Sequence, residues 1–264
     1  MRRRLSWETL VAVALLAAAS NFSLKAALTE ELHKTYPIDA DGRVSLKNVN
    51  GAVHISAWDR NEVQVDAIKR ADTRDVLDEA TIVIDSSSSS ISVRTRYPEQ
   101  DHGRRHHANV EYTLKVPRHA RLFAIETVNG SIEVVGVSGG AKMSTVNGSV
   151  RASGLGGDAH LTTVNGQVEA SFDRLNGTPS INLETVNGGI SLSLPAKGSA
   201  ELDAHTVHGR ITNDFGIPQP KGFKVGGSLS GHIGSGVGAR VKLNTVNGGI
   251  RIYSTMDGRR VLNT

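Results

Sequence analysis

The stretch ETVNGSIEV at residues 126–134 returns five more times in nearly the same form. The other copies are STVNGSVRA (144–152), TTVNGQVEA (162–170), ETVNGGISL (184–192), HTVHGRITN (205–213) and NTVNGGIRI (244–252). Their threonines follow one another at steps of 18, 18, 22, 21 and 39 residues. The last step contains a worn copy at 228–231, and LKNVNGAVHI (46–55) is a further copy upstream. A period near 20 residues predicts a repeat architecture in which neighbouring units stack.

Apolar residues alternate with polar ones on both sides of each Thr-Val-Asn-Gly element. In the second unit Ala141 and Met143 precede the element, and Val150 and Ala152 follow it. This period of two predicts a β-strand on each side. The parity slips across Asn-Gly, which fits either a tight antiparallel hairpin or a solenoid corner with one residue in the left-handed region.

The valine of the element favours the solenoid corner. A hairpin would place it on the polar face, whereas a corner would turn it into the core. We therefore predict an all-β, single-stranded β-solenoid (β-helix) with rungs of about 20 residues, in which stacked asparagines hydrogen-bond from rung to rung. The predicted structural turns are Asn50, Gly51, Asn129, Gly130, Asn147, Gly148, Asn165, Gly166, Asn187, Gly188, His208, Gly209, Asn247 and Gly248.

The first twenty residues resemble a signal peptide. MRRR is a basic start, LVAVALLAAA (10–19) is an apolar core, and small residues at 18–20 offer a cleavage site. Cleavage would leave 27 basic and 25 acidic residues, so the net charge falls from +4 to +2. An uncleaved membrane anchor is the alternative. The chain has no cysteine, which excludes disulfides and a lipidated thiol.

Domain boundaries follow from these patterns. We expect a linker at 21–37, a β-rich capping region at 38–125, the solenoid repeats at 126–256 and a tail at 257–264. Within the capping region, strands are predicted at 62–68, 90–97, 110–116 and 120–126, and DTRDVLDEA (72–80) predicts one short helix. Such a region would cover the open end of the stack.

Several stretches resemble binding or catalytic sites, but each has a simpler reading. His102, His106 and His107 lack the spacing and carboxylate of a metal site, and DADG (39–42) lacks the later ligands of a calcium loop. Serines 86–90 predict a turn, and the glycine-rich 226–238 has no phosphate-binding motif. The residues six positions after each threonine form a file of mixed charge, predicted to be a solvated ladder: Glu133, Arg151, Glu169, Ser191, Thr212 and Arg251.

The repeats, the signal peptide and the run EVQVDAIKRADTRDVLDEATIVID (62–85) together resemble the bacterial putative-adhesin family of β-strand-repeat envelope proteins, originally a domain of unknown function. The likeness covers about residues 38–256. It implies a β-helix exported to the periplasm or cell surface and supplies no catalytic residues.

The sequence favours a non-catalytic envelope scaffold, adhesin-like, that binds a polysaccharide or an envelope protein. We expect no cofactor, no metal and no nucleic-acid partner, because the mature chain has no basic stripe with aromatic residues. A β-helix enzyme acting on polysaccharide, which would need acids or an acid with Arg or Lys in one groove, is one alternative. A structural or regulatory part in envelope stress is another. Membrane contact is expected only through an uncleaved signal, and self-association through the C-terminal rung is possible if the tail frays.

Export is the first testable consequence. Cell fractionation and N-terminal sequencing should find the protein outside the cytoplasm, beginning near Asn21, because the n-region, apolar core and small residues match what a signal peptidase cleaves. A full-length product in the cytoplasm would contradict this expectation.

Overall fold

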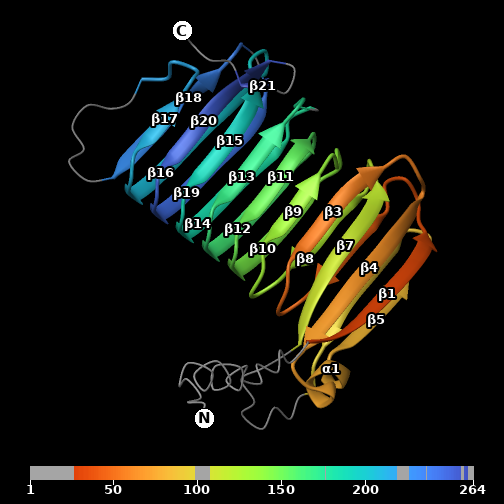
Figure 1. Ribbon diagram of the computed structural model, residues 1–264. Coiled ribbons are helices and arrows are strands. Elements are labelled where there is room, and N and C mark those ends of the chain that lie inside the picture. The colour runs from red at the N-terminus through yellow and green to blue at the C-terminus, as the bar shows by residue number, and fades with distance from the viewer. Residues whose placement is uncertain are drawn as a thin grey trace, which may run out of the picture.

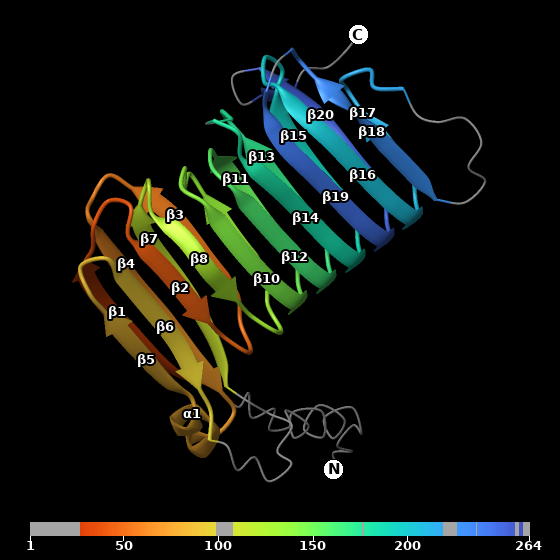
Figure 2. The same cartoon turned by 180° about the vertical axis from the view of Figure 1, so that it is seen from behind.

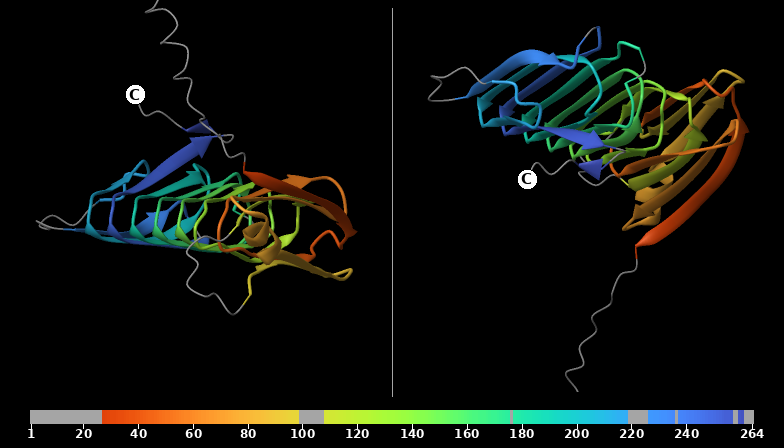
Figure 3. Two further views of the ribbon diagram at one scale, coloured as in Figure 1. Left: turned by 60° about the horizontal axis from the view of Figure 1, so that its bottom comes forward. Right: turned by 90° about the horizontal axis from the view of Figure 1, so that it is seen from above.

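The computed structural model describes residues 27–98, 108–175, 177–218, 226–235, 237–256 and 259–260. Over these residues the protein is all-β, as predicted, and forms two large sheets that face each other (Figures 1 and 2). Buried aliphatic residues fill the space between the two layers (Figure 3). The predicted signal peptide lies outside the described residues.

Both sheets are mixed, with parallel strands in the middle and antiparallel strands at the ends. Sheet A contains, in spatial order, β1 (Leu28–Pro37), β4 (Glu62–Ala71), β7 (Asn109–Pro117), β3 (Val53–Trp58), β9 (Ile132–Val135), β11 (Val150–Leu155), β13 (Val168–Phe172), β15 (Ile190–Pro195), β20 (Ile250–Met256) and β17 (Ile211–Asn213), and β21 (Arg259–Arg260) pairs with β20. Sheet B contains β18 (Gly227–Ile233), β16 (Ala200–His208), β19 (Ala239–Asn247), β14 (Ser180–Asn187), β12 (Ala159–Asn165), β10 (Ala141–Asn147), β8 (Arg121–Glu126), β2 (Arg43–Lys47), β6 (Ser90–Arg96) and β5 (Thr81–Ser86).

Each repeat gives one strand to each sheet. The strand before Asn-Gly joins sheet B and the strand after it joins sheet A, so the two never pair with each other as a hairpin would. Instead, equivalent residues of neighbouring repeats pair in parallel, as Thr145 does with Thr163 and Val150 with Val168. The predicted alternation is confirmed, because the apolar positions on both sides of the corner are buried.

The corner glycines are required for close packing between rungs. We expected the corner to use the left-handed region, but of the seven corner glycines only Gly51 has a positive φ, of 124°. A Cβ on Gly148 would lie 2.1 Å from the carbonyl oxygen of Gly130, and one on Gly166 would lie 2.0 Å from that of Gly148. Each corner backbone therefore rests directly on the one before it, and only glycine leaves room for this approach.

The threonine of each repeat satisfies the carbonyl of the corner below. Thr145 donates its hydroxyl to the carbonyl oxygen of Gly130 at 2.8 Å, and Thr163 does the same to Gly148 at 2.8 Å. These threonines are buried. Because a buried hydroxyl must find a partner, this bond couples the side chain of one rung to the backbone of the next.

The prediction for the valine was wrong. Val146 is 38% exposed and Val164 is 40% exposed, whereas the threonine before each is buried. The threonine occupies the last inward position, and the valine and asparagine both face outward at the bend. The valines line up as an exposed row along the corners, partly covered by their own neighbours in the stack.

The predicted asparagine ladder is present. Asn129 donates its side-chain amide to Asn50 at 2.8 Å, and each following asparagine donates to the one before it in space at 2.8–2.9 Å. The donors are Asn129, Asn147, Asn165, Asn187 and Asn247. All amides point the same way, so one continuous chain of hydrogen bonds runs along the corner.

The order of the last repeats in space differs from their order in sequence. The final repeat, formed by β19 and β20, lies between the 184–192 repeat and the 205–213 repeat (Figure 2). The worn copy at 228–231 is not a rung, because β18 runs antiparallel to β16. The C-terminal rung is therefore interior, and self-association through its edge is not supported, since β17 and β21 occupy that edge of β20.

The N-terminal region extends both sheets beyond the copy at 46–55. That copy stacks directly on the first main repeat, with Asn50 beside Asn129. The predicted strands are confirmed, and the short helix is α1 (Arg74–Glu79), with Thr73 as its N-cap. Its Leu77 is fully buried.

A buried polar cluster closes the repeat stack at this junction. Asn48 stands where other repeats have threonine, and it donates to the carbonyl of Val110 at 2.7 Å. It accepts from Thr95 at 2.9 Å, and Thr95 contacts the Tyr112 hydroxyl at 2.7 Å. Burial raises the pKa of Tyr112 to about 12, while the bond to Thr95 acts in the opposite direction. The longer asparagine side chain thus reaches a strand that belongs to no repeat.

The corner packing predicts a large cost for a single methyl group. Gly148→Ala should lower the free energy of unfolding by about 1–3 kcal/mol, because the new Cβ overlaps the backbone of Gly130. Urea denaturation would measure the change. The matched control is Gly140→Ala, whose Cβ would lie 3.6 Å from its nearest neighbour. Equal destabilisation by both changes would show that corner stacking is not the constraint.

The edge strand β1 predicts a pH dependence. The hydrogen bond from His33 to Asp66, at 2.9 Å, and a second contact with Glu31 raise the pKa of His33 above 6.5. Protonated His33 therefore stabilises β1 fully below about pH 6.5, and this contribution disappears as the pH rises through the raised pKa.

We expect the difference in unfolding free energy between wild type and His33→Gln to shrink from pH 5.5 to pH 8.5. His119→Gln is the control, because the ring of His119 contacts the Ser138 hydroxyl and not a carboxylate. A difference for His33→Gln that stays constant with pH would refute the role of its charge.

Candidate functional site

Polar side chains cover the outer face of sheet B. Along each strand the residues three and five positions before the corner threonine point away from the core, and parallel pairing places them in rows. One row continues through β10, β12, β14, β19, β16 and β18 as Lys142, His160, Asn182, Lys242, Asp203 and Ser230. The repeat therefore builds a face on which neighbouring strands present different polar groups about 4.8 Å apart.

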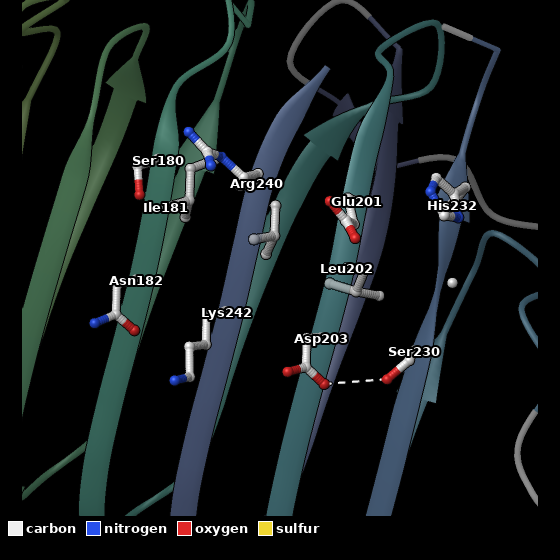
Figure 4. Close-up of a pocket in the computed structure, with 12 residues that line it drawn as sticks. Ser180, Ile181, Asn182, Glu201, Leu202, Asp203, Ser230, His232, Arg240 and Lys242 are labelled. Carbon is white, nitrogen blue, oxygen red and sulfur yellow. Dashed lines mark hydrogen bonds between the residues drawn. The ribbon is translucent and has the colours of Figure 1, made fainter. Parts of the chain in front are cut away.

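A pocket of about 700 Å³ lies on this face at the C-terminal end of the stack. It crosses four strands, β14, β19, β16 and β18, which come together only because the final repeat inserts between two earlier ones (Figure 4). Its charged side chains are Arg240 and Lys242 from β19, and Glu201 and Asp203 from β16.

These opposite charges are neighbours in register but do not form ion pairs with each other. Arg240 pairs with Glu201 in the strand register, and Lys242 pairs with Asp203. Figure 4 shows both cationic side chains leaning toward β14, while Asp203 turns toward β18. Within the described part of the chain, Arg240, Lys242 and Glu201 have no ion-pair partner. Their charges are thus free to meet a ligand.

Other polar groups of the pocket are already engaged. Asp203 accepts from the Ser230 hydroxyl at 3.1 Å and lies 3.3 Å from the Nε2 of His205. The amide nitrogen of Asn182 contacts His160 at 3.1 Å and donates to Glu184 at 3.0 Å. The Oδ1 of Asn182 is buried and has no hydrogen-bond partner among the described residues. The floor of the pocket therefore holds an acceptor that lacks a donor.

A second pocket of about 390 Å³ continues the first along the same face. The two share Ser180 and Asn182, and the second extends to Lys142 and Phe123 on β10 and β8. Phe123 is 62% exposed. The two pockets form one shallow groove, called here the sheet B groove, which crosses the strands from β8 to β18.

The outer face of sheet A is different, because its charges compensate one another. Glu133 lies 3.3 Å from His54, and Arg151 lies 3.6 Å from Glu169. The predicted mixed-charge ladder is confirmed, with one correction in order: Arg251 lies beside Ser191, and Thr212 comes last. The ion pairs are exposed and contribute little to stability.

The other candidate stretches have structural roles or lie outside the described residues. DADG forms a turn, with the Gly42 amide donating to the carbonyl of Asp39 at 2.9 Å, and Ser87 and Ser90 bond each other within the turn at 86–90. His102, His106 and His107 are outside the described residues. No group of three or more metal-ligating side chains occurs in the described part of the chain.

The sequence interpretation missed the sheet B groove. Its charges follow a visible signal, because Glu201 and Asp203 stand at the same repeat positions as Arg240 and Lys242. The sequence order, however, predicted the worn copy at 228–231 as a rung between those two repeats. Only the inserted final repeat brings the acidic and basic strands together.

The fold and the polar face define an all-β repeat protein of the kind found among bacterial adhesin-like proteins. The chain belongs to the Toastrack DUF4097 family, whose model matches residues 19–253. This confirms the resemblance to the putative-adhesin family of unknown function.

Solved structures share the fold at low sequence identity. A "putative cell adhesion protein" from Clostridium sporogenes is 14% identical, with a TM-score of 0.55, covering 86% of this chain and 100% of that chain. A "putative adhesin" from Bacteroides fragilis is 9% identical, with a TM-score of 0.34, covering 84% of this chain and 97% of that chain. No curated protein sequence matches the chain. None of the helices in the described residues has the length and hydropathy needed to cross a membrane.

Proposed function

We propose that this protein is an exported, non-catalytic component of the bacterial cell envelope. It acts as an adhesin-like β-solenoid scaffold, a single chain winding through successive rungs, that presents the sheet B groove to a polymer. Export rests on the signal-like residues 1–20. The winding is supported by the parallel pairing of repeat with repeat in both sheets.

The observation that carries the proposal is the continuous groove on one face. Its two pockets share residues, cross many strands and are open to solvent along their length. An extended polymer can follow such a row of repeated positions, whereas a small substrate usually occupies an enclosed cavity. Uncompensated charges occur in this groove, while the ladder on sheet A is internally paired.

A glycan-processing enzyme is the second candidate, and one observation favours it. Glu201 and Asp203 lie two residues apart on one face of β16, so their Cα atoms are about 6.6 Å apart. Arg240 and Lys242 are on the neighbouring strand. Paired acids at such a separation are what glycosidases use. The scaffold remains the preferred function because Asp203 is held by Ser230 and His205.

A binding and turnover experiment separates the two functions. Purified protein lacking residues 1–20 should cosediment with isolated cell-wall polysaccharide and release no soluble sugar. Phe123→Ala should reduce the bound fraction severalfold, because it removes the exposed aromatic surface at one end of the groove. Val135→Ala, on the outer face of sheet A, is the control and should bind like wild type.

Two results would overturn the scaffold function. Release of sugar by wild type that is abolished in Glu201→Gln would establish the enzyme. Absence of cosedimentation with every polysaccharide fraction would exclude a polymer as the ligand of the groove.

A further inference from the structure

The geometry points to an acidic polysaccharide as the polymer that occupies the sheet B groove, with Arg240 and Lys242 binding its carboxylates. This inference rests on the proposed function and specifies the ligand. It begins from the two cationic side chains of β19, which extend from the same face at alternate positions and have no ion-pair partner among the described residues.

The direction of these side chains decides where an anion binds. Arg240 and Lys242 lean toward β14, away from Glu201 and Asp203 on β16 (Figure 4). A carboxylate bound over the junction of β14 and β19 would meet both cations and the exposed Ser180. It would stay apart from the acids of β16, and this separation avoids the repulsion that a central position would cause.

The spacing of the two cations favours repeated carboxylates. Their Cα atoms are about 6.6 Å apart along the strand, so both can reach one bidentate anion or two neighbouring ones. Arginine matches the planar geometry of a carboxylate, and the lysine ammonium adds a mobile point charge. Lys142 repeats the cationic character further along the groove. A polymer with regularly placed acids would use all three.

The rest of the groove matches a sugar chain better than a peptide. Phe123 offers an exposed aromatic ring at one end, on which the apolar face of a sugar can pack. The unpartnered Oδ1 of Asn182 and the free carboxylate of Glu201 are acceptors for hydroxyl groups. Strands β8 to β18 cover six strand spacings, or about 29 Å, which accommodates several sugar units.

Polygalacturonate and its fully methyl-esterified form are suitable probes. They have the same sugar backbone and differ in charge. Isothermal titration calorimetry in 50 mM NaCl should show that wild type binds the acidic polymer at least tenfold more tightly than the ester. Raising NaCl to 500 mM should remove most of this difference, because exposed ion pairs are screened by salt.

The double variant Arg240→Gln with Lys242→Gln tests the assigned residues. It should raise the Kd for polygalacturonate at least tenfold and leave the Kd for the ester within twofold. The control is Arg151→Gln with Arg251→Gln, which removes the same charge from the outer face of sheet A. It should bind polygalacturonate like wild type. Thermal unfolding followed by circular dichroism checks that both variants are folded.

The outcomes separate this inference from the proposed function. Equal affinity of wild type for the acid and the ester would overturn the anionic specificity while supporting a polysaccharide scaffold. Equal weakening by the two double variants would overturn the assignment of Arg240 and Lys242. Binding of neither polymer, together with no cosedimentation with cell-wall polysaccharide, would overturn both. Binding only to an envelope protein would also overturn both, because the partner would then belong to another class.

Discussion

The contact between stacked glycine corners is the constraint on which the rest of the structure depends. Each corner backbone lies so close to the preceding one that a Cβ would come within about 2 Å of a carbonyl oxygen. That same carbonyl accepts the hydroxyl of a buried threonine, and the neighbouring asparagine bonds across the same interval. Three side chains of the Thr-Val-Asn-Gly element thus serve a single purpose, which is to fix the distance and register between rungs. With the register fixed, every position before and after the corner is assigned to the core or to an outer face.

Much of this fold was readable from the sequence, because repetition and period-two patterning are local properties. The strands, the short helix at Arg74–Glu79 and the asparagine ladder were all predicted. The conformation of the corner was not, because glycine next to asparagine suits both a positive φ and a close approach. Only the distance to the next backbone distinguishes them. The valine was misplaced for the same reason, since the buried position beside the bend belongs to threonine.

The groove could not be predicted, because it depends on long-range order that no repeat encodes. The Thr-Val-Asn-Gly element of 244–252 is the same as that of its neighbours, so its sequence does not state which rung it will join. In the fold it contacts the 184–192 repeat on one side and the 205–213 repeat on the other. The charged strand β19 thereby acquires the acidic strand β16 as a neighbour. Function on this face is a property of the arrangement, and the individual motif carries none of it.

The inserted final repeat also imposes an order of assembly. Strand β16 is synthesised well before β19, yet apart from the antiparallel β18 its neighbour in the sheet is β19. During synthesis the first repeats can stack one after another, but the 205–213 repeat has no parallel partner until residues 239–247 exist. Closing that gap requires a loop of about forty residues to be brought together, which is slower than adding an adjacent rung. The C-terminal end of the stack is therefore expected to complete last, after the whole repeat region has left the ribosome, and for an exported chain that interval keeps this part unfolded during translocation.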